Sequence, residues 1–325
     1  MTSNPDLKSG SAISAIEDEV VFICGALRSG TTLLRLMLDH HPQISNPGEM
    51  DFLFECSLDH NGQYDVASYR EDLRDQRIFN AHSLEIDEGL DYPGLLRSFL
   101  ARLKQPGRLL TINIHRNFDR IPALLPNAKY VHFLRDPRDV ARSSIGMGWA
   151  GNVYHGVDHW VASEKSIDEL KAKVSADQLF QLKNEDLIKD PQNALARLCE
   201  FLGVGFDPLM LTYPENSTYK APDMSLVEQW RRLQTPHEVG LVEGKVSEML
   251  IARGYELSGN PVVSPGVIER FKLSLNNRLG RFSFAAKRNG FGLAVLEILA
   301  RRLPITRLKD YVRRALQEKA RAHLR

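Results

Sequence analysis

Apolar runs alternate with helix-like stretches along the first two thirds of the chain. Four runs have the hydrophobic, β-branched character of buried strands: Val20–Cys24, Leu109–Asn113, Lys129–Leu134 and, more weakly, Leu179–Leu182. Stretches with helical periodicity follow the first three runs, and the first of these helices is expected from about Thr31 to His41. This alternation predicts an α/β fold in which a mainly parallel sheet carries helices on both faces.

The segments between and after these runs predict additions to the sheet. Residues 60–102 are polar and aromatic without a strand pattern, so we expect helices and loops there, in a position suited to contacts with a substrate. Residues 191–202 predict a helix with proline at its first position. Two further helices are expected within 224–252.

Asn260–Pro261 interrupts the pattern and predicts a domain boundary. The expected parts are a loose arm at 1–18, a main domain at 19–261 and a helical extension at 262–325. Charge separates the last two parts, although the whole chain of 325 residues carries a net charge of only +1. The extension has 15 Lys/Arg against 4 Asp/Glu, a net +11, whereas the rest has 27 against 37, a net −10. Each part therefore needs its own interpretation.

Composition narrows the class of protein. The content of 43% hydrophobic and 26% charged residues is ordinary for a globular chain, and no apolar run is long enough to span a bilayer. Residues 1–18 contain no apolar core of signal-peptide length, and the three widely spaced cysteines, Cys24, Cys56 and Cys199, form no C-x-x-C pair. His155 and His159 lack a third ligand for a metal. We expect a cytoplasmic protein without a structural metal or a disulfide framework.

A glycine-bearing turn joins the first strand to the first helix. Gly25–Thr32 has the G-x-x-x-x-G spacing of a phosphate-binding loop, and backbone N–H groups at a helix N-terminus attract anions. Thr31 stands where a nucleoside triphosphatase has its lysine, and the positive charge comes from Arg28 inside the loop. The loop therefore suits a phosphate-like group that is not a magnesium–triphosphate.

This loop resembles the 5′-phosphosulfate loop of sulfotransferases that use 3′-phosphoadenosine 5′-phosphosulfate (PAPS). Arg28, Ser29, Gly30, Thr31 and Thr32 match it position by position, in the form typical of tyrosylprotein sulfotransferases and many bacterial members. The resemblance implies a P-loop-like fold, PAPS as co-substrate, no metal, and contact between these five residues and the donor.

A second motif follows the predicted strand at 129–134. Asp136 and Pro137 favour the start of a helix, and Arg135 stands at the carboxyl end of a strand, where open α/β sheets bind ligands. The resemblance implies that Arg135 and Ser143, eight residues apart, bind the 3′-phosphate of the donor. It covers roughly Val20 to Glu256 and leaves the extension out.

Two further segments match the family less closely. Asn184 stands where many relatives have a tyrosine before Glu-Asp-Leu, so any contact of that tyrosine with the nucleotide is in question. Ser217 and Lys220 correspond to a serine and a lysine that contact the donor in a segment closing over the nucleotide, although the intervening length differs.

Sulfuryl transfer needs a base for the proton of the acceptor. Glu49 lies 21 residues after Arg28. The resemblance to tyrosylprotein sulfotransferases implies a catalytic role for it, because their catalytic glutamate stands at the same distance from their loop arginine. His115 follows a strand, where cytosolic sulfotransferases carry their catalytic histidine, and it could act as base or stabilise the leaving group. Both stay candidates for a catalytic role, together with Arg28.

The extension predicts three helices, the last beginning at Ile305 and carrying one apolar face flanked by arginines. Such helices pack on the acidic domain, lie on an anionic lipid surface or bind a partner protein, and the lipid alternative would place the protein on the inner face of a membrane. Nucleic-acid binding is not favoured, because aromatic residues are sparse between the basic ones.

The predicted function is sulfuryl transfer from PAPS to an acceptor hydroxyl or amine on a glycan, lipid, small metabolite or peptide. Two alternatives stay open: an ATP-dependent phosphotransferase, and a nucleotide-binding membrane adaptor without catalysis. The sequence does not decide the acceptor or the oligomeric state.

Overall fold

The computed structural model describes residues 20–303 and 305–322. The arm expected at 1–18 lies outside them. The chain divides into two compact units: unit 1 comprises Met1–Arg135 and His159–Gln229, and unit 2 comprises Asp136–Asp158 and Trp230–Arg325. The domain boundary at Pro261 stays a prediction.

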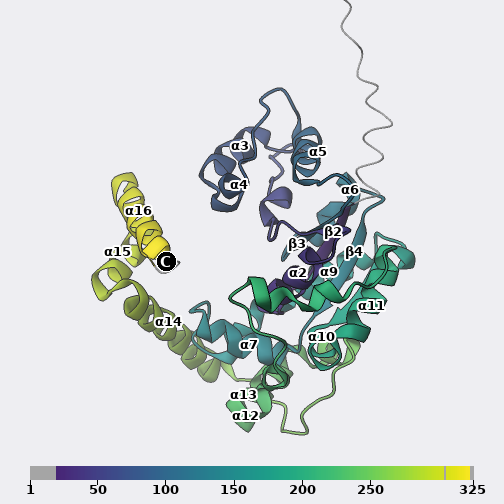
Figure 1. Cartoon of the computed structure of the whole chain (residues 1–325). Coiled ribbons are helices and arrows are strands. Elements are labelled where there is room, and N and C mark those ends of the chain that lie inside the picture. Colours follow the sequence, from purple (N-terminus) through teal and green to yellow (C-terminus); the bar gives the residue numbers. More distant parts are fainter. Residues whose placement is uncertain (1–19, 304, 323–325) are drawn as a thin grey trace, which may run out of the picture. The chain divides into compact units, whose positions relative to one another are not determined.

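Unit 1 is built on one five-stranded sheet in the order β2-β3-β1-β4-β5, with every neighbouring pair parallel (Figure 1). The strands are β1 (Val20–Cys24), β2 (Ile44–Ser45), β3 (Leu109–Ile114), β4 (Lys129–Leu134) and β5 (Leu179–Lys183). The four predicted strands are confirmed within one residue of their ends. β2 has only two residues, too few for a sequence pattern to show it.

Alternating side chains of the strands enter two separate hydrophobic cores. Phe22 and Ile112 lie in one core together with apolar residues of α3 (Val66–Asp75), α5 (Tyr92–Leu103) and α9 (Asp158–Lys171). Ile23 and Val131 lie in the other, with residues of α2 (Thr31–Asp39), α10 (Asn184–Lys189) and α11 (Pro191–Leu202). Helices therefore cover both faces of the sheet, as the uniform hydrophobicity of the strands predicts.

The segment expected to hold helices and loops, 60–102, contains α3, α4 (Arg77–Ala81) and α5. The other α-helix of unit 1 is α6 (Ile121–Leu124). Short 3₁₀ helices complete the described elements: η1 (Asp51–Phe54), η2 (Phe118–Arg120), η3 (Ala176–Gln178), η4 (Pro208–Leu211), η5 (Tyr213–Asn216) and η6 (Met224–Leu226).

Unit 2 is helical over its described residues. Its helices are α7 (Pro137–Gly146), α8 (Val153–Gly156), α12 (Trp230–Leu233), α13 (Pro236–Ala252), α14 (Val267–Asn289), α15 (Phe291–Arg302) and α16 (Thr306–Ala322). The three helices predicted for the extension are α14 to α16. Among the described helices, none combines the length and apolar character that crossing a bilayer requires.

A buried ionic cluster lies at the start of α7. Arg138 forms ion pairs of 2.7 Å with Asp136 and with Glu243 of α13, and its guanidinium stacks 3.8 Å from the ring centroid of Trp230. Burial lowers the pKa of Arg138, but the two carboxylates outweigh burial and raise it overall. One guanidinium held between two carboxylates therefore joins α7, α12 and α13.

Candidate functional site

The glycine loop leaves β1 and enters α2 with two residues in left-handed backbone conformation. Arg28 has φ 73°, and Gly30, the N-cap of α2, has φ 88°. A side chain at Gly25 would overlap the backbone carbonyl of Phe133, and one at Gly30 would overlap the side-chain amide of Asn184. Glycine is therefore required at both ends of the turn, by sterics that the spacing alone does not reveal.

The loop contains a buried hydroxyl that the described protein does not satisfy. Ser29 is 1% exposed, and its Oγ has no hydrogen-bond partner among the described residues. Native proteins rarely leave such a group unpaired, and this one lies at the N-terminus of a nine-residue helix. An anionic oxygen in the loop would complete it, so the residues fit a phosphate or phosphosulfate group.

Arg135 brings the second predicted motif to this loop. Its guanidinium donates a 3.0 Å hydrogen bond to the backbone carbonyl of Arg28 and a 3.2 Å bond to that of Leu226. Burial first, and then the charge of Arg135, lower the pKa of the Arg28 guanidinium. Two like charges held this close favour an anion between or beside them.

The segment before Leu226 approaches the same place. The phenol of Tyr219 counts among the groups that act on the charge of Arg28. Ser217 Oγ accepts a 3.2 Å hydrogen bond from the backbone N–H of Tyr219. The backbone carbonyl of Lys220 accepts a 2.8 Å bond from Tyr213 OH, while the side chain of Lys220 is exposed. No pattern in the sequence identifies Tyr219 as a neighbour of Arg28.

Backbone hydrogen bonds fix the loop that carries Glu49 to the end of β3. Asn113 donates its N–H to Gly48 O and accepts one from Met50 N, both at 3.0 Å. The side chain of Asn113 also donates to the carbonyl of Thr31 at 3.1 Å and accepts from Asn46 at 3.1 Å. This fully buried amide therefore joins the Glu49 loop to the glycine loop. A polar residue inside an apolar strand was the signal that could have identified it.

His115 lies between a carboxylate and the glycine loop. Its Nδ1 is 3.0 Å from Asp51 Oδ2, its backbone N–H donates to Asp51 Oδ1 at 2.7 Å, and its Nε2 is 3.2 Å from Thr31 Oγ1. The side chain is 2% exposed. Burial raises the pKa of Asp51, but the hydrogen bonds and charge of His115 outweigh burial and lower it overall. Both ring nitrogens are thus engaged within the protein.

A pocket of about 390 Å³ adjoins Glu49. Its walls come from the first turn of α2, the Glu49 loop and α4: Thr32, Arg35, Pro47, Gly48, Glu49, Arg77, Ile78, Ala81 and His82. Glu49 is half-buried, and its charge acts on Arg28. A carboxylate, the glycine loop and a concave space therefore meet in unit 1.

Ser143, the expected second ligand of the 3′-phosphate, lies half-buried in α7 of unit 2. Its contact with that phosphate stays a prediction. Among the described residues, no cluster of three His, Cys, Asp or Glu side chains is arranged to hold a metal ion.

Comparison with known proteins gives consistent results. The profile described as Sulfotransferase family matches residues 20–208. A Mycobacterium bovis omega-hydroxy-beta-dihydromenaquinone-9 sulfotransferase is 30% identical over 139 residues, 36% of each chain. A putative protein-tyrosine sulfotransferase of Caenorhabditis briggsae is 27% identical over 204 residues, 61% of this chain and 70% of that one.

Among solved structures, the sulfotransferase domain of the Synechococcus PCC 7002 olefin synthase has a TM-score of 0.52 and 26% identity. The match covers 70% of this chain and 94% of that domain. The chain spans about a third of the length of the first curated relatives it matches. The resemblance found in the sequence and the expected α/β fold are both confirmed.

Proposed function

The chain belongs to the sulfotransferase family, and on that premise we propose that it transfers a sulfuryl group from PAPS to an acceptor hydroxyl or amine. The observation that carries the proposal is the hydrogen bond from Arg135 to the carbonyl of Arg28, which unites two anion-binding motifs at one edge of the sheet. Ser29 supplies the unsatisfied donor beside them.

We assign different residues to different parts of the donor. The loop amides, Ser29, Thr31, Thr32 and Arg28 would hold the 5′-phosphosulfate, and PAPS supplies an activated sulfur–oxygen bond when it is bound. Arg135 and Ser143 would bind the 3′-phosphate, with Ser217 and Lys220 as further donors to the nucleotide.

Glu49 is proposed as the general base. It accepts the acceptor proton as the acceptor oxygen or nitrogen bonds to sulfur and the bond from sulfur to the 5′-phosphate breaks. Arg28 and the loop amides stabilise the negative charge that the leaving phosphate acquires, and adenosine 3′,5′-bisphosphate is released. Because both nitrogens of His115 are engaged and its side chain is buried, we assign it to positioning Thr31 rather than to proton transfer.

Donor-dependent transfer of ³⁵S from labelled PAPS to extracts of glycans, lipids, metabolites and peptides, followed by mass spectrometry, tests this function. Binding of adenosine 3′,5′-bisphosphate by calorimetry is measured in parallel. Absence of both would reject the proposal. Magnesium-dependent ATP turnover with indifference to the bisphosphate would instead support a phosphotransferase, which Thr31 at the lysine position argues against.

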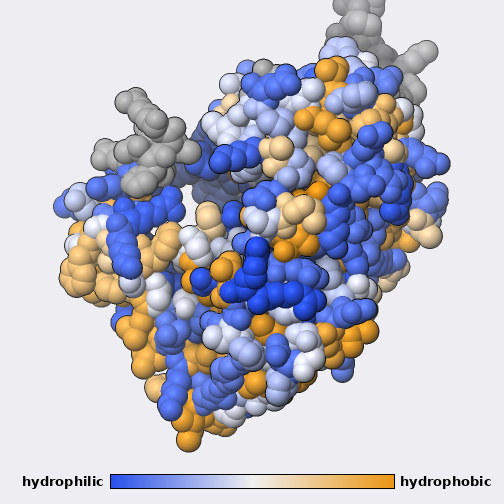
Figure 2. Space-filling view, turned by 60° about the horizontal axis from the view of Figure 1, so that its bottom comes forward, coloured by the Kyte–Doolittle hydropathy of each residue, from blue (hydrophilic) through white to orange (hydrophobic). Residues whose placement is uncertain are grey.

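A membrane role for unit 2 is a second proposal, and exposed apolar residues on α14 support it. Val267, Phe271 and Leu279 are 78%, 70% and 60% exposed. Basic residues accompany them along α14: Arg270, Lys272, Arg278, Arg281, Lys287 and Arg288. Hydrophobic and hydrophilic residues also stand side by side over the C-terminal helices at the left of Figure 2. An apolar row beside cationic groups suits a surface of anionic lipid.

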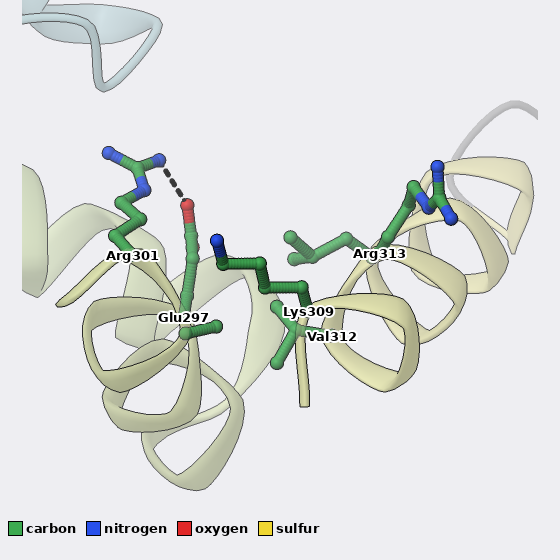
Figure 3. A pocket seen from close by; sticks show the side chains of 7 residues that line it. Glu297, Arg301, Lys309, Val312 and Arg313 are labelled. Carbon is green, nitrogen blue, oxygen red and sulfur yellow. Dashed lines mark hydrogen bonds and ion pairs between the residues drawn. The ribbon is translucent and has the colours of Figure 1, made fainter. Parts of the chain in front are cut away.

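α15 and α16 add a basic pocket of about 670 Å³ (Figure 3). Arg301 of α15 and Lys309 and Arg313 of α16 contribute positive charge, and Glu297 contributes the one carboxylate of the lining. The floor includes Val312, so the pocket combines apolar contact with cationic groups. Such a lining fits the head and first chain atoms of an anionic lipid.

Co-sedimentation with vesicles tests the membrane proposal. The full chain is expected to bind vesicles that contain 30% phosphatidylglycerol and to lose binding in pure phosphatidylcholine. Phe271→Ser with Leu279→Ser should reduce binding, whereas Ser274→Ala on the same helix should not. Equal recovery with both vesicle types, or no binding, would sink the proposal.

A further inference from the structure

The pocket beside Glu49 has a charge pattern that goes beyond a generic acceptor site. The side chain of Arg35 lies next to Gly48: a Cβ added to Gly48 would be 3.7 Å from Cδ of Arg35. Arg77 is the first residue of α4 and lines the same pocket. Neither arginine forms an ion pair with a described residue, although Glu49 lines the same pocket.

The rest of the lining adds little fixed charge. Burial lowers the pKa of His82, so its imidazole is mainly neutral at neutral pH and serves as a hydrogen-bonding group. Ile78, Ala81 and Pro47 give apolar contact. With Glu49 ionised, the pocket has two guanidinium groups against one carboxylate.

We propose that the acceptor carries a carboxylate, phosphate or sulfate a few atoms from the group that is sulfated, and that Arg35 and Arg77 bind this anion. The inference rests on the proposed function, because it takes Glu49 as the base at the reacting end of the pocket. Guanidinium groups form forked, charge-assisted hydrogen bonds with such oxyanions. With a neutral acceptor, the pocket would hold two guanidinium groups against the single carboxylate of Glu49.

The pocket also limits what can enter. A volume of about 390 Å³ lies at the small end of the range for ligand sites, so one ring and a short acidic arm would occupy it. The apolar residues Ile78 and Ala81 would contact the ring. An acidic phenol or a uronic acid has this combination, whether free or as the end of a larger molecule.

Matched probes test the inference. Calorimetry compares 4-hydroxyphenylacetate with 4-hydroxyphenylethanol, and glucuronate with glucose, on the full chain with and without saturating adenosine 3′,5′-bisphosphate. At least one acidic probe is expected to bind tenfold or more tightly than its neutral partner. Arg77→Gln and Arg35→Gln should each remove most of that preference. Arg102→Gln is the control, because Arg102 of α5 pairs with Glu85 and lies outside the lining of the pocket.

The outcomes separate this inference from the proposed function. Equal binding of acidic and neutral probes, or a preference that persists in both arginine variants, overturns the inference even if the bisphosphate binds. Failure to bind the bisphosphate overturns the sulfotransferase proposal, whereas an arginine-dependent preference would still establish the anion site. Arg77 is exposed at a helix start, so Arg77→Gln should fold even if Arg35→Gln does not.

Discussion

The guanidinium of Arg135 donates a hydrogen bond of 3.0 Å to the backbone carbonyl of Arg28. These residues are 107 positions apart in the chain, and each lies in a motif that follows a strand of the same parallel sheet. Because β1 and β4 are neighbours, their carboxyl ends bring both motifs to one edge. The charge of an anion bound at one motif would therefore act on the other motif.

Arg135→Lys tests this connection. Lysine keeps the charge but loses the planar fork and the geometry of the bond to Arg28, so we expect the affinity for adenosine 3′,5′-bisphosphate to fall by about 10- to 100-fold, the equivalent of about 1.5–3 kcal/mol for a hydrogen bond to a charged group. Calorimetry measures it. Arg197→Gln on α11 is the control, and equal losses in the two variants would contradict the assignment.

Glu49→Gln and His115→Gln should affect different steps. Loss of the base is expected to lower kcat by about 10²- to 10⁴-fold with nucleotide affinity unchanged. Loss of the histidine should weaken nucleotide binding, because Thr31 Oγ1 loses its 3.2 Å partner. Single-turnover rates and calorimetry on both variants separate the two effects. A normal rate for Glu49→Gln would show that another group takes the proton.

Asp51 should contribute to stability in a defined pH range. Its pKa in the folded chain lies below the ordinary 3.8, so the carboxylate stabilises the fold above about pH 4, and this contribution is lost as pH falls through the lower folded value. In Asp51→Asn the melting temperature should drop at pH 7 and the difference from wild type should shrink towards pH 3. Melting curves from pH 3 to 8 measure this; a constant difference would refute it.

Gly30→Ala should weaken nucleotide binding more than it weakens the fold. The substitution forces a Cβ into left-handed backbone, at a cost of about 1–2 kcal/mol, and against the side chain of Asn184. Gly62→Ala is a matched control, since Gly62 has φ 76° but nothing within 4 Å of an added Cβ. Both variants should lose stability, and only Gly30→Ala should lose affinity for the bisphosphate.

Glu243→Gln should destabilise unit 2. It removes one of the two carboxylates that bind Arg138 inside a buried cluster. Asp136 still pairs with Arg138, so the expected cost is that of a lost hydrogen bond to a charged group, about 1.5–3 kcal/mol. Glu248→Gln on the exposed side of the same helix should change stability by less than about 0.5 kcal/mol. Denaturant unfolding followed by tryptophan fluorescence measures the free energy of unfolding of both variants, since Trp230 stacks on Arg138. Equal midpoints for the two variants would show that the cluster contributes little.

The local pattern of the chain determined the strands, the glycine turn and the family. Strands buried on both faces must be hydrophobic at every position, which makes Val20–Cys24 and Lys129–Leu134 visible in the sequence. The turn after β1 is equally local, because its glycine spacing and Arg28 stand within eight residues.

Tertiary structure decided how the site residues are joined. Asn113 links two loops, and Asp51 holds His115 against Thr31, through hydrogen bonds between residues 64 to 84 positions apart. No short pattern encodes such contacts, because they depend on which strands become neighbours and on which side chains their ends then present. The sequence by itself therefore determined the glycine loop and the Arg135 motif, and only the fold could show that His115 is enclosed while Glu49 lines an open pocket with two arginines.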